Sequence, residues 1–288
     1  MSHAIEVTGL SHYYSYGTPS QVAAIKDINL TIDKGEAIGI IGHTGSGKST
    51  LISHLNGLLK PSEGKVLLDG EDIRKDKETL RASRFKVGLC FQYPEYQLFE
   101  ETVFKDIAYG PKNMKLSDEE IKERVFRAAK YAGVKEELLD KSPFDLSGGE
   151  KRRAAIAGVL AMEPEVLVLD EPAAGLDPAG RKSLIELIRN YRESTGSTVI
   201  TVSHSMEDIT RLADRIIVMN AGTIAMDGTV DEVFSHADEL RKMGLNVPEI
   251  TCVFSALRER GIDVPANVYS VEEGAEILRA LAGRGAAE

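Results

Sequence analysis

Short apolar runs alternate with stretches in which apolar residues recur every three or four positions along this chain. The runs 37–41 (AIGII), 166–169 (VLVL) and 198–202 (TVITV) are continuous and largely apolar. Runs of this length are typical of strands buried on both faces, whereas a 3.6-residue repeat is typical of helices. The alternation predicts an α/β domain with a mostly parallel sheet.

The same pattern predicts three helices near those strands. Residues 49–56 follow the first run through a glycine-rich turn, and residues 179–194 join the other two runs as a strand–helix–strand crossover. Residues 117–132 have helical periodicity and begin with Ser117 and Glu120, which have the spacing of a capping box. We therefore expect helices in all three segments.

Two parts of the chain do not belong to this central pattern. The segment 64–70 (GKVLLDG) is a brief apolar run between turn residues, and it predicts an antiparallel β layer beside the main sheet. After residue 228 the chain becomes amphipathic, with helices expected at 248–260 and 271–281. A separate carboxy-terminal helical piece is therefore expected.

Composition and charge narrow the classes of protein. The formal net charge of −10 argues against wholesale binding to nucleic acid or to an anionic membrane surface. Cys90 and Cys252 stand alone without CxxC spacing, so we expect a reduced, cytosolic compartment. The sequence has no stretch of roughly 20 apolar residues that would span a bilayer. Work at a membrane would therefore need another polypeptide that crosses it.

A phosphate-binding loop is the strongest chemical signal. The segment 42–49 (GHTGSGKS) matches the pattern G-x-x-x-x-G-K-[ST] between a strand and a helix. Its glycines let backbone N–H groups surround a phosphate, Lys48 would reach the β and γ phosphates, and the Ser49 hydroxyl would coordinate Mg²⁺. A flexible glycine-rich turn is the alternative. The expected ATP-binding residues here are Gly42, His43, Thr44, Gly45, Ser46, Gly47, Lys48, Ser49 and Thr50.

Two carboxylates follow the apolar run 166–169. Asp170 and Glu171 stand at the carboxyl end of the predicted strand, where ligands bind in open α/β sheets. Alone, such a pair is more often a turn or an ion pair, but the phosphate loop upstream reverses that reading. We expect Asp170 to hold Mg²⁺ and Glu171 to act as the general base towards water.

A third segment also opens a helix with exposed amides. The residues are Leu146, Ser147, Gly148, Gly149 and Glu150 (LSGGE), and Ser147 and Glu150 are spaced as a capping box. Read simply, the segment is a helix cap. Two glycines at a helix start also make a second anion site, for which another phosphate must be supplied.

Together, LSGGE, the phosphate loop and VLVLDEP resemble the nucleotide-binding domain of ATP-binding cassette (ABC) proteins. The resemblance implies that the signature segment 146–150 of one subunit closes over ATP held by its partner. It also implies an α/β P-loop NTPase core with an antiparallel β subdomain and a helical subdomain. The expected domains are 1–230, with the helical subdomain at about 92–162, and 231–288 as a C-terminal extension that helps dimerisation.

Further residues match positions of that family. Gln92 resembles the glutamine that links the Mg²⁺ site to a membrane partner, and His204 resembles the switch histidine at the γ-phosphate. Asp177 resembles the residue that communicates across the dimer. Tyr14 looks like the aromatic residue that stacks on adenine, but Tyr13 and Tyr16 compete for that role. Gln92 and His204 join Glu171 as expected catalytic residues, and the expected Mg²⁺ ligands are Ser49, Gln92 and Asp170.

A finer resemblance is to the ATPases of energy-coupling factor (ECF) transporters. The segment 91–99 (FQYPEYQLF) resembles the FQ-x-P-[DE]-x-Q-LF signature of that group, although it also reads as a proline-started turn. The resemblance makes it a docking surface for a transmembrane coupling subunit. The expected docking residues are Pro94, Glu95, Tyr96, Gln97, Leu98 and Phe99.

The sequence therefore predicts a peripheral ATPase on the cytoplasmic face of the cell membrane. It would use ATP and Mg²⁺ to drive a micronutrient importer, together with a second nucleotide-binding subunit, a transmembrane subunit and a substrate-binding membrane subunit. The ATPase of another ABC importer is the alternative. A cassette protein that acts on ribosomes or DNA would have two cassettes or a long coiled-coil insertion. This sequence has neither, which argues against that class. The transported substrate and the choice between homodimer and heterodimer stay open.

Overall fold

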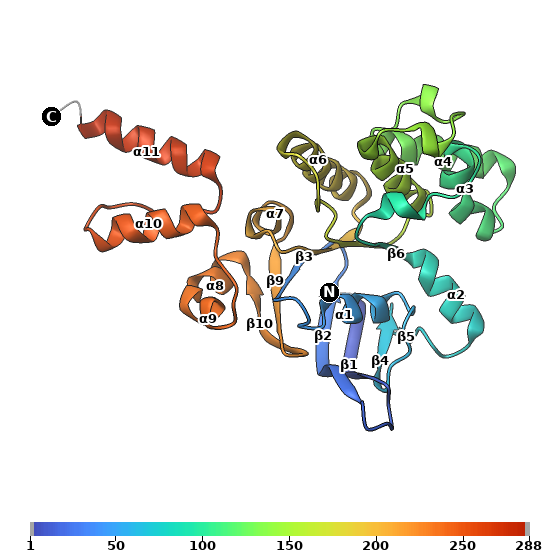
Figure 1. Cartoon of the computed structure of the whole chain (residues 1–288), viewed down its shortest axis with the longest axis horizontal. Helices are drawn as coiled ribbons and strands as arrows, with labels where there is room; N and C mark the ends of the chain where they lie inside the picture. Colours follow the sequence, from blue (N-terminus) through green and yellow to red (C-terminus); the bar gives the residue numbers. More distant parts are fainter. Residues whose placement is uncertain (1–2, 286–288) are drawn as a thin grey trace.

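The computed structural model describes residues 3–285, and a six-stranded sheet forms its centre (Figure 1). The strand order is β10-β9-β3-β8-β7-β6, and the neighbours from β9 to β6 all pair in parallel. Only β10 is antiparallel. The strands are β3 (Ala37–Ile41), β6 (Val87–Cys90), β7 (Val166–Asp170), β8 (Thr198–Val202), β9 (Arg215–Asn220) and β10 (Thr223–Thr229).

Every residue of β3, β7 and β8 is buried, because the sheet is covered on both faces. On one face, Val168 and Ile200 pack in a cluster with Leu51 and Ile52 of α1 (Lys48–Leu55). On the other, Leu167 packs in a second cluster with residues of the helices α3 (Val103–Asn113), α4 (Asp118–Ala132), α5 (Gly148–Leu160) and α6. The predicted mostly parallel sheet and its crossover helix, α6 (Pro178–Thr195), are confirmed.

A second, antiparallel sheet lies against α1, on the side away from the helices α3 to α5 (Figure 1). Its strand order is β2-β1-β4-β5, so the segment 64–70 contributes to the antiparallel layer that the sequence predicted. The strands are β1 (His3–Tyr14), β2 (Val22–Asp33), β4 (Glu63–Leu68) and β5 (Glu71–Asp72).

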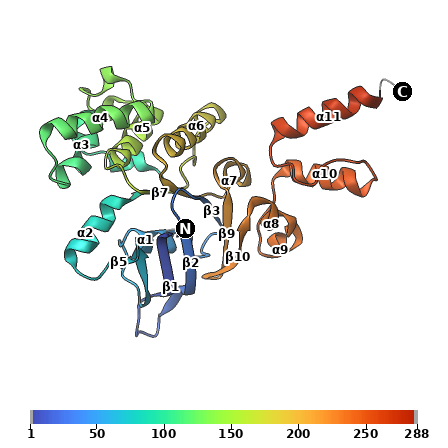
Figure 2. The same ribbon diagram turned by 180° about the vertical axis from the view of Figure 1, so that it is seen from behind.

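The helical part between β6 and β7 forms its own bundle (Figures 1 and 2). Helix α4 begins with the predicted capping box, in which the Ser117 hydroxyl accepts from the Glu120 amide and the Glu120 carboxylate accepts from the Ser117 amide. The helices from β5 to β7 are α2 (Lys77–Lys86), η1 (Pro94–Gln97), α3 (Val103–Asn113), α4 (Asp118–Ala132), η2 (Glu136–Leu138), η3 (Pro143–Asp145) and α5 (Gly148–Leu160).

The carboxy-terminal helices extend away from the sheets in both views (Figures 1 and 2). Helices α8 and α9 still pack on α7 and β9, whereas Phe254 of α10 starts a separate small apolar cluster. The division at residue 230 stays a prediction. The helices are α7 (Met206–Leu212), α8 (Val230–Ser235), α9 (Ala237–Lys242), α10 (Glu249–Glu259) and α11 (Val271–Gly285). Among residues 3–285, no helix combines the length and the apolar character needed to cross a bilayer.

Candidate functional site

The phosphate loop connects β3 to α1 at the carboxyl edge of the parallel sheet. Two glycines are required by close approach: a Cβ on Gly42 would lie 2.4 Å from Met219 O, and one on Gly47, at φ 104°, would lie 2.7 Å from Ala24 O. The Lys48 Nζ donates to Gly42 O at 2.6 Å and to His43 O at 3.1 Å. Burial lowers the pKa of Lys48, so its ammonium is held over the loop as a poorly solvated cation.

Asp170 ends β7 and faces the first turn of α1. The Ser49 Oγ donates to Asp170 Oδ2 at 3.1 Å, so the two expected Mg²⁺ ligands are already adjacent. Burial raises the pKa of Asp170, while the Ser49 hydroxyl and the Lys48 charge lower it. A cation bound here would oppose the effect of burial, and oxygen ligands of this kind suit Mg²⁺.

Glu171 is held in a sparsely populated backbone conformation beside Asp170. Its φ is +48°, and its amide donates to Val202 O at 2.9 Å. The Oε1 atom is buried and accepts no hydrogen bond, and His204 Nε2 lies 3.4 Å from it. Burial raises the pKa of Glu171. A carboxylate with an unpartnered oxygen at the site can accept a proton from water.

One cavity of about 430 Å³ collects most of the expected ATP-site residues. Its walls include Tyr14, Gln92, Asp170, Glu171 and His204, in addition to residues 44, 45 and 47–50 of the phosphate loop. Burial, followed by the charge of Lys48, lowers the pKa of His204. The cavity is also lined by Val22, Ala23 and Ala24 of β2, which no motif marked in the sequence.

Of the three competing tyrosines, only Tyr14 lines this cavity. Its hydroxyl lies 3.3 Å from Thr50 Oγ1, and the His12 ring packs edge-on against it at 4.8 Å between centroids. The rings of Tyr13 and Tyr16 pack on each other instead, at 5.7 Å. Tyr14 is therefore the one of the three tyrosines whose side chain borders the cavity.

The segment 146–150 does not reach the cavity of its own chain. Ser147 caps α5 with the predicted capping box, and Leu146 is buried. A Cβ on Gly148 or Gly149 would meet no atom within 4 Å, so this helix start faces open space. Asp177 likewise caps α6, through a 2.8 Å bond from the Gly180 amide, and does not line the cavity.

The expected docking residues divide into two groups. Tyr96 and Phe99 are 84% and 58% exposed, and Gln97 is also exposed. Pro94 is buried, Leu98 packs on the core, and Glu95 turns inwards.

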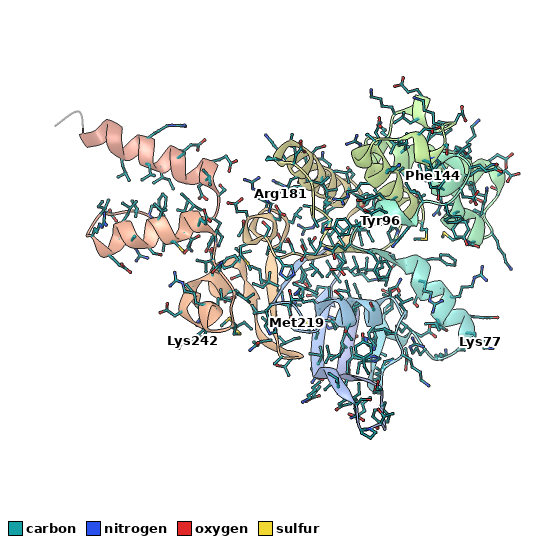
Figure 3. All side chains as sticks on the ribbon, in the orientation of Figure 1. Lys77, Tyr96, Phe144, Arg181, Met219 and Lys242 are labelled. Carbon is teal, nitrogen blue, oxygen red and sulfur yellow. The ribbon has the colours of Figure 1, made fainter. Side chains whose placement is uncertain are left out.

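An exposed ring from another segment adds to this surface. Phe144, at 66% exposure, shares a hollow of about 190 Å³ with Tyr96, a neighbour that the sequence did not indicate (Figure 3).

Arg152 of α5 is the buried partner of Glu95. Its guanidinium makes two bonds to the Glu95 carboxylate, at 2.7 and 3.0 Å, and donates to Ala174 O at 2.7 Å and Pro172 O at 3.3 Å. It also lies over the Tyr93 ring. Arg152 therefore joins the docking segment, the helix of LSGGE and the loop before Asp177. The sequence analysis missed it because its partners are far apart in the chain.

Comparison with known proteins relates this site to one family. Residues 25–174, which include the phosphate loop and Asp170, match the family model described as ABC transporter. Among curated proteins, the chain is 57% identical to the energy-coupling factor transporter ATP-binding protein EcfA2 of Caldanaerobacter subterraneus, over 97% of this chain and 98% of that protein. It is 51% identical to the protein of the same name from Clostridium perfringens, over 96% and 97%.

Solved structures with the same fold include two informative ones. The structure of cbiO1 from Clostridium perfringens, part of the ABC transporter complex cbiONQ, has a TM-score of 0.74 and 40% identity over 87% of this chain and 98% of that one. The dimeric ATP-binding cassette MJ0796, in a post-hydrolysis state with ADP and Pi, has a TM-score of 0.70 and 30% identity over 78% and 98%.

Proposed function

Because the chain belongs to the ABC transporter family, as an ATP-binding subunit of an energy-coupling factor transporter, we propose that it drives import of a micronutrient. The cargo would be a vitamin or a transition-metal ion. The cavity that joins the phosphate loop to Glu171 and His204 carries this proposal, because it combines phosphate binding with a general base. The subunit would work as a peripheral protein on the cytoplasmic face of the membrane.

The triphosphate would lie along the loop from Gly42 to Thr50. Backbone N–H groups and the start of α1 would surround the β-phosphate, and Lys48 would turn from its two carbonyl partners to the phosphate oxygens. Tyr14 would stack on the base. His204, whose side chain is 52% exposed, would approach the γ-phosphate from the opposite wall.

Ser49, Asp170 and Gln92 are the side chains that fit Mg²⁺. The first two touch each other, and all three line the cavity. These three residues would hold Mg²⁺, which would supply positive charge to stabilise the negative charge that develops on the phosphate. The buried Asp170 carboxylate would gain a second cationic partner in addition to Lys48.

Glu171 would activate water for attack on the γ-phosphate. Its partner-free Oε1 is inside the cavity wall, and its strained backbone fixes the carboxylate direction. Phosphoryl transfer needs positioning and charge stabilisation more than covalent chemistry. We therefore assign the base to Glu171 and the γ-phosphate contact to His204.

A second nucleotide-binding subunit would complete each site. The LSGGE helix start faces open space in this chain, as expected for a segment that closes over ATP on a partner. The dimeric MJ0796 cassette supports this arrangement. Both halves of a site are present here, so the chain is compatible with self-pairing and with a related partner.

The exposed rings around Tyr96 would contact a transmembrane coupling subunit. That subunit would stand beside a substrate-binding membrane protein, and no nucleic acid is involved. The complex that includes cbiO1 supports such an assembly. Tyr96 and Phe99 would supply apolar contact, since exposed aromatic side chains commonly anchor interfaces.

The experiment is affinity purification of the chain from membranes in detergent, with the co-purifying proteins identified by mass spectrometry. We expect a transmembrane scaffold and a small substrate-binding membrane protein. The purified complex should hydrolyse ATP, and Glu171→Gln should abolish turnover while ATP stays bound.

The matched control is Glu186→Gln, which removes an exposed carboxylate on α6. It should leave turnover unchanged. Full hydrolysis by the Glu171→Gln complex would contradict the assignment of Glu171 as the general base. Recovery of the permease of another importer type would replace the ECF proposal.

A further inference from the structure

Arg181, near the start of α6, reaches across to α7 (Figure 3). Its Nε donates to Asp208 Oδ1 at 2.6 Å, and its Nη2 donates to Ser205 Oγ. The Asp208 side chain is buried, so this ion pair is shielded from water on one side. The bond to Asp208 raises the pKa of Arg181, which keeps its charge at all working pH values.

The backbone of Arg181 is tied to Asp177. The Arg181 amide donates to Asp177 O at 2.9 Å, and the Gly180 amide donates to Asp177 Oδ1 at 2.8 Å. The first four N–H groups of a helix have no partner within the helix, and here the Asp177 cap binds one of them and fixes the first turn of α6. A displacement of Asp177 would therefore move Arg181.

The other end of the contact lies next to His204. Ser205 Oγ accepts from Arg181 and from the Asp208 amide at 3.3 Å, and the Ser205 amide donates to Ser203 Oγ at 3.0 Å. Residues on both sides of His204 are thus held by hydrogen bonds. The His204 side chain is half exposed, so its place depends on this backbone rather than on packing around the ring.

We propose that Arg181 is a positioning residue for hydrolysis, which fixes the backbone around His204 and links it to the Asp177 loop. The proposal rests on the assignment of Glu171 and His204 in the proposed function. The chain of contacts runs from Asp177 through Arg181 to Ser205, and it ends 3.4 Å from Glu171 at His204. A displacement of Asp177 when the dimer closes would therefore move the backbone of His204 relative to the γ-phosphate.

The experiment measures kcat and KM for ATP in the purified complex with Arg181→Gln and Arg181→Lys. We expect kcat to fall about tenfold in Arg181→Gln, since small misplacements of a reacting geometry can cost up to ~100-fold. KM should change less than about twofold, because Arg181 does not line the cavity. A fall in kcat at nearly constant KM separates a positioning role from a general loss of ATP binding.

Arg181→Lys keeps the positive charge but lacks the planar fork that reaches two partners. It should lose less kcat than Arg181→Gln, with a KM for ATP close to that of the parent. Arg189→Gln, an exposed arginine farther along α6, is the control and should match the parent.

Two results would overturn the inference: parental kcat in Arg181→Gln, or a rise in KM for ATP as large as the fall in kcat. If Arg181→Gln does not fold, as judged by thermal unfolding, the kcat of Arg181→Lys decides. Glu171→Gln is measured in parallel. Hydrolysis by that variant would remove the proposed function, whereas an inactive Glu171→Gln beside a parental Arg181→Gln would remove only the role of Arg181.

Discussion

Glu171 combines a left-handed backbone, a partly buried carboxylate and a buried oxygen without a hydrogen-bond partner. Each of these costs free energy in a folded chain, and together they occur where water would be activated. Natural enzymes commonly keep such residues because the reaction needs them, at the expense of stability. The side chain is therefore a place where function and stability oppose each other.

Glu171→Gln should stabilise the nucleotide-free protein. The variant replaces a buried charge beside Asp170 with a neutral amide of the same shape. We expect Tm to rise by about 2–4 °C, the shift that ~1 kcal/mol produces in a chain of this size. The measurement is thermal unfolding at neutral pH, with Glu186→Gln as the control.

The pH dependence of that difference has a defined sign. Burial raises the pKa of Glu171 in the folded state, so the folded parent binds its proton at higher pH than the unfolded chain. The destabilisation is present at neutral pH and disappears as the pH falls through the folded pKa. The gap in Tm between variant and parent should close on acidification; a gap independent of pH would contradict this cause.

Tyr14→Ala should weaken ATP binding. Stacking of a base on an aromatic ring contributes about 1–3 kcal/mol, so KM for ATP should rise about tenfold or more. Tyr16→Ala is the matched control because Tyr16 packs on Tyr13 outside the cavity. Equal effects of the two variants on KM would argue against Tyr14 as the stacking residue.

The sequence indicated residues whose chemistry is set by their neighbours in the chain. The phosphate loop, Asp170 and Glu171 follow directly from β3 and β7, and the structure brings them into one cavity. The inward turn of Glu95 could not be predicted, because it depends on Arg152, 57 positions away. Arg181 was missed for the same reason, since its partners lie on another helix.

At the scale of elements, the sequence predicted the strands and helices whose apolar periods or caps are strong, but not β1, β2, β9 or β10. Continuous apolar runs gave β3, β7 and β8, and capping boxes marked the starts of α4 and α5. The part of the cavity wall formed by β2 could not be predicted. Val22 to Ala24 carry no motif, and they reach the cavity only through the packing of the two sheets. Local patterns define elements, but contacts between elements define the site.

The pair of Glu95 and Arg152 holds one such contact between elements. Arg152→Lys should destabilise the chain, because lysine cannot bind a carboxylate in two places and reach two carbonyls as well. Breaking a buried pair typically costs about 3–5 kcal/mol, and retention of the charge should limit the loss to ~2 kcal/mol. Urea unfolding measures this loss.

The effect should also be local. Amide hydrogen exchange should increase in the docking segment around Tyr96 and in the first turn of α5, which Arg152 joins. Arg153→Lys, at the next position of the same helix, is the control. Faster exchange spread evenly over the sheets would mean that Arg152 acts on overall stability alone.

At the scale of the whole molecule, the two ends of α7 connect different parts. Arg181 holds its start, and Arg211, near its end, pairs with Glu272 of α11 at 2.9 Å. Tyr269 also donates to Asp231 of α8 at 2.6 Å. The carboxy-terminal helices are therefore attached to the helix that follows His204, rather than to a distant surface.

The position of Ser147, outside the cavity of its own chain, has a genetic consequence for a homodimer. One copy with Glu171→Gln and another with Ser147→Arg would each be inactive alone. In the mixed dimer, the Glu171→Gln copy supplies an intact signature segment 146–150, and the Ser147→Arg copy supplies an intact Glu171. These two parts form one complete site, while the other site carries both substitutions. Co-expression of the two alleles should restore transport, whereas each allele paired with itself should not. Lack of such complementation would point to a heterodimer with unequal sites.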